Sequence, residues 1–470
     1  MLFLPELSLL GAGLILFIFS LGNPSSGKIK NVATGLAAST LIASLICIKS
    51  EGSLFYSAYH VDFFSQLFKV LIALATLIVL IFTNRNGDLK EQTRSEYYLF
   101  LFMSVLGLMM LVSSVELISI FVALELSSFA VYIMVPMRNN DSTLGAQSEA
   151  GVKYLLFGVM ATGLMLFGMS YMYGLTGSTQ IPIIAEKLSL MYSQPAAVIA
   201  ILLVLAGFFY KLALFPLHFW VPDIYEGASN ETTAFIAAVP KIAAVALLIR
   251  IVTLVSSEGE VIVNVLIVCA LLSMFYGNLS ALIQKDVKRL LGFSGISHAG
   301  FVLVGLLTFQ ITGYATAMYY IIGYVFMNLA CFLVICSVAE NGRNVTVEDF
   351  TGLHKRAPLL ALTLTVGLFA LAGIPPFVGF TGKFLLLLGA FKQGHHILVI
   401  LAAINTAIAI YYYLSIVRVT FCTEPEDRGT VISSGLNNTL AVLLIITMIV
   451  MGVMPSQFIA MTTSAIQTIM

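Results

Sequence analysis

Long apolar runs, separated by short polar stretches, fill the chain from end to end. A helix needs roughly 20 mostly apolar residues to cross a hydrocarbon layer about 30 Å thick. By that measure the pattern predicts about fourteen transmembrane helices, near residues 3–21, 31–48, 61–83, 97–113, 115–136, 152–174, 196–218, 232–255, 261–283, 290–308, 313–338, 358–389, 396–420 and 436–457. The narrowest division is the turn at Ser113 and Ser114. The predicted fold class is an all-α polytopic membrane protein.

The composition also indicates a lipid environment. Of the 470 residues, 59% are hydrophobic and 10% are charged, whereas soluble domains contain about 25% charged residues. No polar stretch is long enough for a separate soluble domain, so residues 1–470 are expected to form a single membrane domain. The first apolar run lacks the basic region and the cleavage site of a signal peptide, so we expect it to be retained as the first span.

The seventh and the twelfth predicted spans each contain a lysine next to helix-breaking residues. Lys211 precedes Pro216 by five residues, and Lys383 follows Pro375 and Pro376. The two spans are five apart, and because five is odd, this offset predicts two five-helix repeats of inverted topology with broken helices 7 and 12. The backbone of a break is tolerated only against protein or a water-filled cavity, so water should reach both lysines. The predicted parts are N-terminal spans in 1–96, a first repeat in 97–255, a second in 261–420 and a final span in 436–457.

The basic residues of the loops predict the orientation of the chain, because cytoplasmic loops carry an excess of Lys and Arg. With both termini outside, the outer loops hold only Lys49, Lys187, Arg250 and Lys392. The inner loops then hold Lys28, Lys30, Arg85, Lys90, Arg94, Arg138, Lys285, Lys288, Arg289, Arg343, Lys355, Arg356, Arg418 and Arg428. This asymmetry predicts that both termini face the periplasmic side of a bacterial inner membrane.

Five basic residues remain within or at the ends of the predicted spans, namely Lys69, Lys153, Lys211, Lys241 and Lys383. An ionised side chain at mid-membrane costs about 2.5–3.5 kcal/mol on insertion scales, so a central charge is a candidate for function. Glu125 lies near the middle of the fifth predicted span. An ammonium within reach would keep this carboxylate ionised. These residues are therefore candidates for a functional site.

Two of the lysines have no carboxylate on their own helix. Lys241 directly follows Pro240, and Lys383 follows the second break. A buried lysine without such a partner can exchange its proton near neutral pH. His218 and His298 would extend a relay, because imidazole titrates near physiological pH. The pattern predicts a proton path through the bundle.

Structural interpretations compete with this prediction at three positions. Lys153 lies four residues after Glu149, which is the spacing of an ordinary helix salt bridge. Lys69 is expected to extend its ammonium outward along its alkyl stem. His218 lies near the inner end of its span and could cap a helix.

The sequence offers little other chemistry. The five cysteines show no C-x-x-C or Cys/His spacing that could hold zinc, haem or an iron–sulfur cluster. We therefore expect no metal site, redox centre or cofactor site in this chain. The 23 basic and 23 acidic residues cancel, so nothing suggests a nucleic acid partner.

Four segments resemble a known family: EAGVKYLLFG (149–158), PLHFWVPDIYEGAS (216–229), FSGISHAGF (293–301) and AGIPPFVGFTGKF (372–384). Over most of its length the chain resembles the antiporter-like subunit N of respiratory complex I, the proton-translocating NADH:quinone oxidoreductase. The motifs are shared in part with subunits L and M and with multi-component sodium/proton antiporters. One departure is EGASNETTAF (226–235), where the family is expected to have a proline-containing stretch.

The resemblance implies a membrane-arm subunit that moves protons outward while quinone is reduced elsewhere in the complex. It implies that Glu125 and Lys211 form a coupling ion pair. Lys241 then resembles the central lysine, and Lys383 resembles the terminal proton site. Lys153 resembles an additional lysine of subunit N, which favours function over the salt-bridge interpretation.

The resemblance also implies the surroundings of the chain. Quinone, NADH, FMN and iron–sulfur clusters would belong to other subunits, and the partners would be other membrane-arm subunits, the lipid bilayer and protons. Two rival functions stay open. One is a subunit of a secondary sodium/proton antiporter, for which transport would depend on sodium. The other is a scaffold with vestigial lysines, for which Lys241→Ala would retain full pumping.

Overall fold

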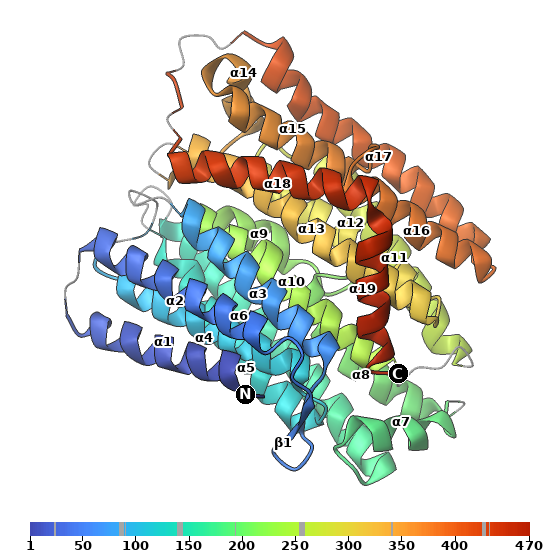
Figure 1. The fold of residues 1–470 in the computed structure, drawn as a ribbon. Helices are drawn as coiled ribbons and strands as arrows, with labels where there is room; N and C mark the ends of the chain where they lie inside the picture. The colour runs from blue at the N-terminus through green and yellow to red at the C-terminus, as the bar shows by residue number, and fades with distance from the viewer. Residues whose placement is uncertain are drawn as a thin grey trace.

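A computed structural model describes residues 1–22, 25–83, 89, 91–138, 144–192, 194–252, 259–339, 342–424, 429–431 and 433–470. The predicted inner-loop residues Arg85, Lys90 and Arg428 lie outside this part of the chain. Helices make up most of the described chain, as Figure 1 shows.

The N-terminal region contains three apolar helices and a hairpin. The helices are α1 (Leu4–Ser20), α2 (Ser26–Ile46) and α3 (Phe63–Phe82). Strands β1 (Gly52–Leu54) and β2 (Tyr59–Val61) form an antiparallel pair with Gly52 opposite Val61. Asp62 begins α3 with a capping box that it shares with Ser65. The sequence pattern did not predict the hairpin.

The next elements follow the predicted first repeat. They are α4 (Arg94–Ser113), α5 (Leu117–Met134), a 3₁₀ turn (Val135–Met137), α6 (Leu144–Thr176), α7 (Ile181–Ser189), α8 (Pro195–Leu212), α9 (Trp220–Gly227) and α10 (Asn230–Val252). The division predicted at Ser113 and Ser114 is confirmed, because α4 ends at Ser113 and α5 begins at Leu117. The short helix α7 was not predicted.

The elements of the predicted second repeat and the C-terminal region complete the fold. They are α11 (Glu260–Ala281), α12 (Val287–Leu306), α13 (Ile311–Val338), a 3₁₀ helix (Val347–Phe350), α14 (Leu353–Arg356), α15 (Pro358–Ala372), α16 (Val378–Lys392), α17 (His396–Cys422), α18 (Gly435–Val453) and α19 (Pro455–Gln467). The final predicted span ends earlier than expected, because α19 starts a new direction at Pro455 (Figure 1).

Both predicted helix breaks are present. The seventh predicted span is interrupted after α8, where Ala213 has a left-handed backbone with φ of 64°. The twelfth predicted span consists of α15 and α16, and Gly373 with φ of 85° ends α15. A left-handed residue terminates an α-helix, and glycine adopts this conformation at little cost. The second break therefore lies at a glycine, whereas the first lies at Ala213, three residues before Pro216.

Twelve helices of the described chain are long and apolar enough to cross a membrane, and α1 and α15 are shorter apolar helices. The prediction of an all-α, multi-pass membrane protein is confirmed. The total of fourteen spans, the repeat relation and the division into four parts remain predictions.

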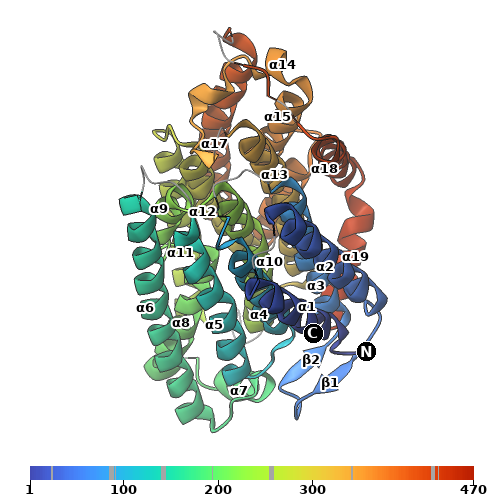
Figure 2. The same ribbon diagram turned by 90° about the vertical axis from the view of Figure 1, so that its left-hand side faces the viewer.

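Loop contacts gather the helix ends into two groups. At one end, which we call the basic end, Arg138 donates to the carbonyls of Glu226 and Gly342, and Asn230 donates to that of Arg343. At the opposite end, which we call the terminal end, the Cys47 thiol donates to the carbonyl of Met1. The hairpin also lies there (Figure 2). The loops with predicted positive excess and the N-terminus thus lie at opposite ends.

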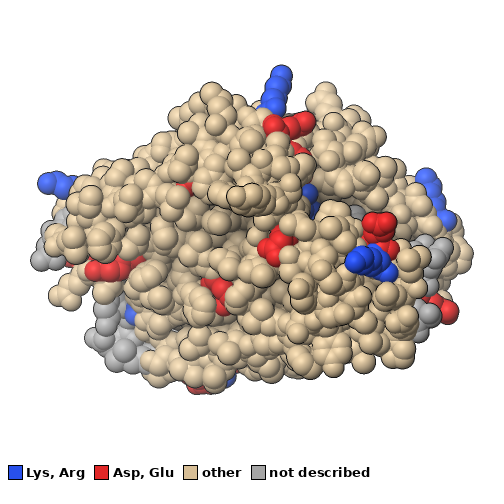
Figure 3. All heavy atoms as spheres, turned by 90° about the horizontal axis from the view of Figure 1, so that it is seen from below, with Lys and Arg blue, Asp and Glu red and all other residues tan. Residues whose placement is uncertain are grey.

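The centre of the bundle is formed by α10, α12 and α13. Every residue of α10 is buried, and most of α12 and α13 is buried as well. Peripheral helices such as α2, α6, α17 and α18 expose many apolar side chains, and Figure 3 shows a face with few charged residues. Such a surface suits lipid or a neighbouring membrane subunit. Lys211, Lys241 and Lys383 are held inside it.

Candidate proton-relay site

The first group of site residues joins α5, α6 and α8. Lys211, in the last turn of α8, donates hydrogen bonds to the hydroxyls of Ser127 at 2.8 Å and Ser128 at 2.9 Å. Glu125 accepts a hydrogen bond of 2.6 Å from Thr162 on α6. Lys211 is buried, whereas Glu125 is half-buried.

The ion pair predicted between Glu125 and Lys211 is not formed. Among the described residues no salt bridge joins them, and each group has hydroxyl partners instead. Glu125 is two and three residues before the serines that hold Lys211, so the carboxylate and the ammonium lie on neighbouring parts of α5. A serine hydroxyl can both donate and accept a hydrogen bond. The two serine hydroxyls therefore hold the lysine by hydrogen bonds and not by an opposite charge.

The second group surrounds Lys241, in the middle of α10. Its ammonium donates to the hydroxyl of Tyr324 at 3.1 Å and lies 5.2 Å from the centre of that ring. A cavity of about 10 Å³, close to the volume that one water needs, is lined by Lys241, Tyr324 and Leu212. A Cβ atom on Gly295 would lie 2.5 Å from the lysine nitrogen, so a larger residue at this position would require the lysine side chain to move. Lys241 thus has a hydroxyl and a water-sized space beside it.

The third group is centred on His298 of α12. Its Nδ1 lies 2.6 Å from the Tyr320 hydroxyl, and its Nε2 lies 3.2 Å from the Tyr413 hydroxyl. The ring centroid is 5.0 Å from that of Tyr324. In a neutral imidazole one nitrogen donates and the other accepts. The histidine can therefore accept a proton from one hydroxyl and release one to the other.

The fourth group is the second helix break. The ammonium of Lys383 donates to the carbonyls of Leu371 at 2.9 Å and Ala372 at 3.2 Å, and it lies 5.1 Å from the centre of the Phe301 ring. These carbonyls end α15, where the helix dipole favours a positive charge. Lys383 therefore caps the first half of the broken helix with its charge.

His218 does not cap a helix by a hydrogen bond within the described chain, which was the structural alternative to a relay role. It lies between α8 and α9, it is fully buried, and neither ring nitrogen has a hydrogen-bond partner within the described chain. Its ring packs 4.3 Å from that of Phe219 and 4.3 Å from that of Tyr276. The structure brings it to the first break but not into contact with Lys211 or Lys241.

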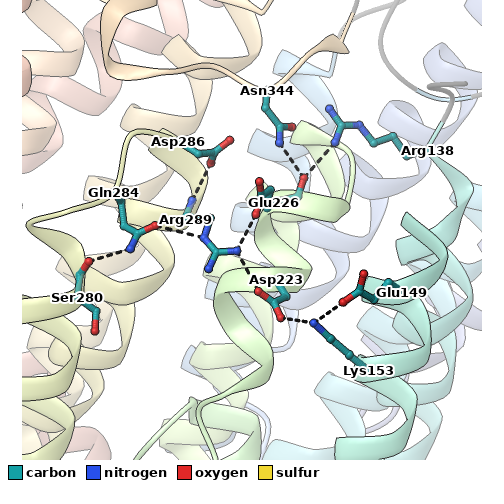
Figure 4. Close-up of polar contacts among 10 residues, drawn as sticks. All are labelled: Arg138, Glu149, Lys153, Asp223, Glu226, Ser280, Gln284, Asp286, Arg289 and Asn344. Carbon is teal, nitrogen blue, oxygen red and sulfur yellow. Dashed lines mark hydrogen bonds and ion pairs between the residues drawn. The ribbon is translucent and has the colours of Figure 1, made fainter. Parts of the chain in front are cut away.

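A cluster of charged residues lies at the basic end (Figure 4). Lys153 pairs with Glu149 at 2.6 Å, as the helical spacing predicted, and also with Asp223 at 2.7 Å. Arg289 joins Asp223 at 2.9 Å to Glu226 at 2.6 Å. These five residues, which we call the basic-end cluster, line a cavity of about 200 Å³. The side chains are partly exposed, so water reaches them.

Lys69 lies outside the four groups and the basic-end cluster. It is fully buried and pairs with Glu6 at 2.9 Å, so the expectation that it extends outward is wrong. Sequence analysis also did not identify the tyrosines at 320, 324 and 413 and the serines at 127 and 128 as site residues. The run of three tyrosines at 411–413 was a signal, since an apolar helix has little need of phenol groups. Asp223 was visible in the motif VPDIYEGA, although its partner Arg289 was not.

Among the described residues no group of three or more His, Cys, Asp or Glu is placed to hold a metal ion. What the site can do is transfer protons, because its polar groups are amines, imidazole, phenols and hydroxyls. A bundle of apolar helices with buried lysines beside two broken helices defines the class of antiporter-like membrane subunits that move protons.

Comparison with known proteins narrows that class. A family model described as NADH:quinone oxidoreductase/Mrp antiporter, TM matches residues 114–409. NADH-quinone oxidoreductase subunit N 2 of Opitutus terrae is 49% identical over 470 residues, which cover 99% of this chain and 98% of that protein. The protein of the same description from Syntrophobacter fumaroxidans is 42% identical over 472 residues, covering 100% of this chain and 99% of that protein.

Solved structures with a similar fold come from the same kinds of complex. A chain of respiratory complex I from Thermus thermophilus with bound aureothin matches with a TM-score of 0.84 and 28% identity, over 97% of this chain and 98% of that chain. A chain of the Mrp complex from Dietzia sp. DQ12-45-1b shares the fold, with a TM-score of 0.86 at 20% identity over 99% of this chain and 96% of that chain.

The chain belongs to the family of subunit N of NADH-quinone oxidoreductase, and the resemblance found in its motifs is confirmed. It is a membrane-arm, antiporter-like subunit of complex I, which is a proton-translocating enzyme.

Proposed function

We propose that this chain passes protons along the buried groups around Lys211, Lys241, His298 and Lys383, driven by quinone reduction in other subunits. One observation carries the proposal. Lys241 contacts Tyr324, whose ring lies beside His298, and His298 contacts Tyr320. Neither Lys241 nor Lys383 has an acidic partner within the described chain. A lysine held by neutral groups can give up and regain its proton.

The basic-end cluster is the proposed entrance. Its cavity of about 200 Å³ is open to water, and Asp223 joins Lys153 to Arg289. From there the proton reaches Lys211, whose neighbour Leu212 forms part of the wall around Lys241. Each transfer breaks an N–H or O–H bond on the donor and forms one on the acceptor. Phenols and hydroxyls between the lysines serve as both.

Glu125 is the proposed contact with the driving machinery. It is half-buried, and its helix exposes Ile118, Val122 and Phe129. This apolar surface suits another membrane-arm subunit of complex I. A change of charge across that contact would draw Lys211 away from its serines toward Glu125, forming the ion pair that this structure does not contain.

The assembled complex carrying Lys241→Met tests the relay, with Lys392→Met as the matched control because Lys392 is exposed at the end of α16. Proton pumping and quinone reductase activity are measured together, and assembly is checked on native gels. We expect Lys241→Met to lose both activities in an assembled complex and the control to keep them. Full pumping in assembled Lys241→Met would contradict the relay and favour a scaffold. A sodium requirement for pumping would favour the antiporter alternative.

We also infer that the basic end faces the cytoplasm of a bacterial cell and that both termini face the periplasm. The support is the excess of Lys and Arg in the loops at that end. Cys422 is exposed at the end of α17, on the basic side. A membrane-impermeant maleimide should label Cys422 in inside-out vesicles and leave it unlabelled in right-side-out vesicles. The reverse labelling would invert the topology.

NADH, FMN, iron–sulfur clusters and quinone are assigned by this proposal to other subunits. The purified chain should therefore show no quinone reductase activity by itself, whereas the assembled complex should. Activity of the isolated chain would refute this assignment.

A further inference from the structure

Another buried lysine, Lys69, lies outside the proposed relay, close to the terminal end. The ammonium of Lys69 lies 2.9 Å from Oε1 of Glu6, and both side chains are fully buried. The Tyr59 hydroxyl donates to the same carboxylate oxygen at 2.6 Å, and the Tyr59 ring centre is 5.1 Å from the lysine nitrogen. Helices α1 and α3 and strand β2 thus meet at one buried ion pair.

The polar atoms around this pair are incompletely satisfied. Oε2 of Glu6 and both side-chain polar atoms of Gln66 have no hydrogen-bond partner within the described chain. The Lys69 nitrogen has the Glu6 carboxylate as its partner. Buried polar groups in native proteins are satisfied by protein or by ordered water. These atoms therefore need partners that the described chain does not supply, and ordered water is the usual partner in such a place.

The same face of α3 continues toward the terminal end. Asp62, Gln66 and Lys69 are spaced four and three residues apart, so they lie on one side of the helix. Asp62 accepts two hydrogen bonds from Arg250, at 2.9 and 2.7 Å. Asp62 and Arg250 line a cavity of about 510 Å³, and Tyr56 on its wall is fully exposed. A polar face thus leads from the buried pair to outside water.

The surroundings of the pair also point to the relay. Helix α3 packs against α10 and α13, which carry Lys241 and Tyr324. Titratable groups that interact electrostatically with Glu6 or Lys69 include Tyr59, Cys47, Asp62 and Arg250. If the ion pair served only to hold α1 against α3, the buried amide of Gln66 without a partner would have no explanation.

We propose that Glu6, Gln66 and Lys69 form a hydrated proton-exchange site that serves as an exit branch toward the terminal end. The proposal rests on the relay proposed above. The Lys69 ammonium gives a proton to the Glu6 carboxylate, so an N–H bond breaks, an O–H bond forms and both groups become neutral. The acid then releases the proton to water, which passes Asp62 and Arg250 to the outside. A proton from the relay side restores the ammonium.

The double variant E6Q/K69M tests the site, because it removes both charges and leaves no unpaired ion. The matched control K355M/E424Q removes the exposed ion pair between Lys355 and Glu424, 2.6 Å apart at the basic end. Assembly, quinone reductase activity and protons moved per quinone reduced are measured in membrane vesicles. We expect E6Q/K69M to assemble and to move fewer protons per quinone, and the control to match the unmodified complex. An unchanged proton yield in assembled E6Q/K69M would overturn the proposal.

Gln66→Leu decides the question if the double variant does not assemble. Leucine has a similar volume, and the amide of Gln66 makes no hydrogen bond within the described chain that could be lost. We expect a lower proton yield in the assembled variant, since the water site loses its amide, and an unchanged yield would overturn the proposal. Lys241→Met provides the separate test of the relay, so loss of pumping there with full yield in Gln66→Leu would remove only the exit branch.

Discussion

The two broken helices differ in the side chain that donates hydrogen bonds to the backbone carbonyls at the break. In each, a side chain from the second half-helix donates to carbonyls at the end of the first. At the first break the Trp220 indole donates to the carbonyl of Tyr210 at 3.0 Å. At the second break the Lys383 ammonium donates to the carbonyls of Leu371 and Ala372.

The difference lies in what each donor can do. An indole N–H does not titrate, so the first break is capped in every protonation state, and Lys211 is free to bind serine hydroxyls on α5. At the second break one group is both the cap and the proposed proton carrier. Loss of its charge weakens its attraction to the helix end. Proton release from Lys383 is thus tied to the backbone of α15, whereas proton release from Lys211 is not.

The largest expected effect separates these two roles of Lys383. Lys383→Arg keeps the positive charge and the donors that cap α15, but a guanidinium does not release its proton. We expect an assembled complex whose pumping falls by about tenfold or more, which corresponds to at least about 1.4 kcal/mol in the barrier. Lys383→Met should lose pumping and also destabilise the complex toward heat, because the two carbonyls lose their donor.

Lys392→Arg is the control for this pair of variants, since it changes an exposed lysine of the same helix. Pumping in vesicles and the temperature of dissociation on native gels are the two readouts. Normal pumping in Lys383→Arg would show that only the cap matters at the second break.

Both breaks were predictable from the sequence because their causes are local. Prolines and glycines favour helix ends, and Lys211 and Lys383 lie within a few residues of such positions, although Pro240 lies inside the continuous helix α10. The long apolar helices were predictable for a similar reason, since the length of an apolar run determines whether a helix can cross a bilayer, and twelve helices of the described chain are long enough.

The contacts of the site were not predictable, because they join helices far apart in the sequence. Tyr324 on α13 meets Lys241 on α10, and Glu6 on α1 meets Lys69 on α3. Helical periodicity gives the face of a residue but not the helix that packs against it. The expectation that Lys69 reaches outward failed for this reason. The missing ion pair of Glu125 and Lys211 is a different case, since the resemblance indicates the residues but not the state of their contact.

The second prediction concerns the hydroxyls that hold Lys211. Replacing both Ser127 and Ser128 with Ala leaves the buried ammonium without its two acceptors. An unsatisfied buried group costs about 1–3 kcal/mol, so we expect Lys211 to move toward Glu125 and pumping to fall by several fold. Pumping is measured in vesicles, with Ser39→Ala as the control because Ser39 is exposed on α2. Unchanged pumping in the double variant would mean that the serines do not take part.

The third prediction tests whether the first break has a cap independent of charge. Trp220→Phe removes the indole N–H, but the carbonyl of Tyr210 keeps a hydrogen bond of 3.1 Å from the backbone of Ala213. We expect a loss of about 0.5–1.5 kcal/mol in stability with proton yield per quinone unchanged. Heat dissociation of the complex and vesicle pumping check the two parts. A fall in proton yield would place Trp220 in the relay and weaken the contrast between the breaks.

The smallest effect is expected at Ala213, the left-handed residue of the first break. A left-handed backbone costs a residue other than glycine about 1–2 kcal/mol, whereas glycine loses about 0.5–1 kcal/mol through its larger freedom in the unfolded chain. The two nearly cancel, so Ala213→Gly should change heat stability only slightly and leave pumping intact. Gly373→Ala should be worse, because its Cβ would lie 3.1 Å from Cδ of Lys383. Equal losses in both variants would contradict this difference between the two breaks.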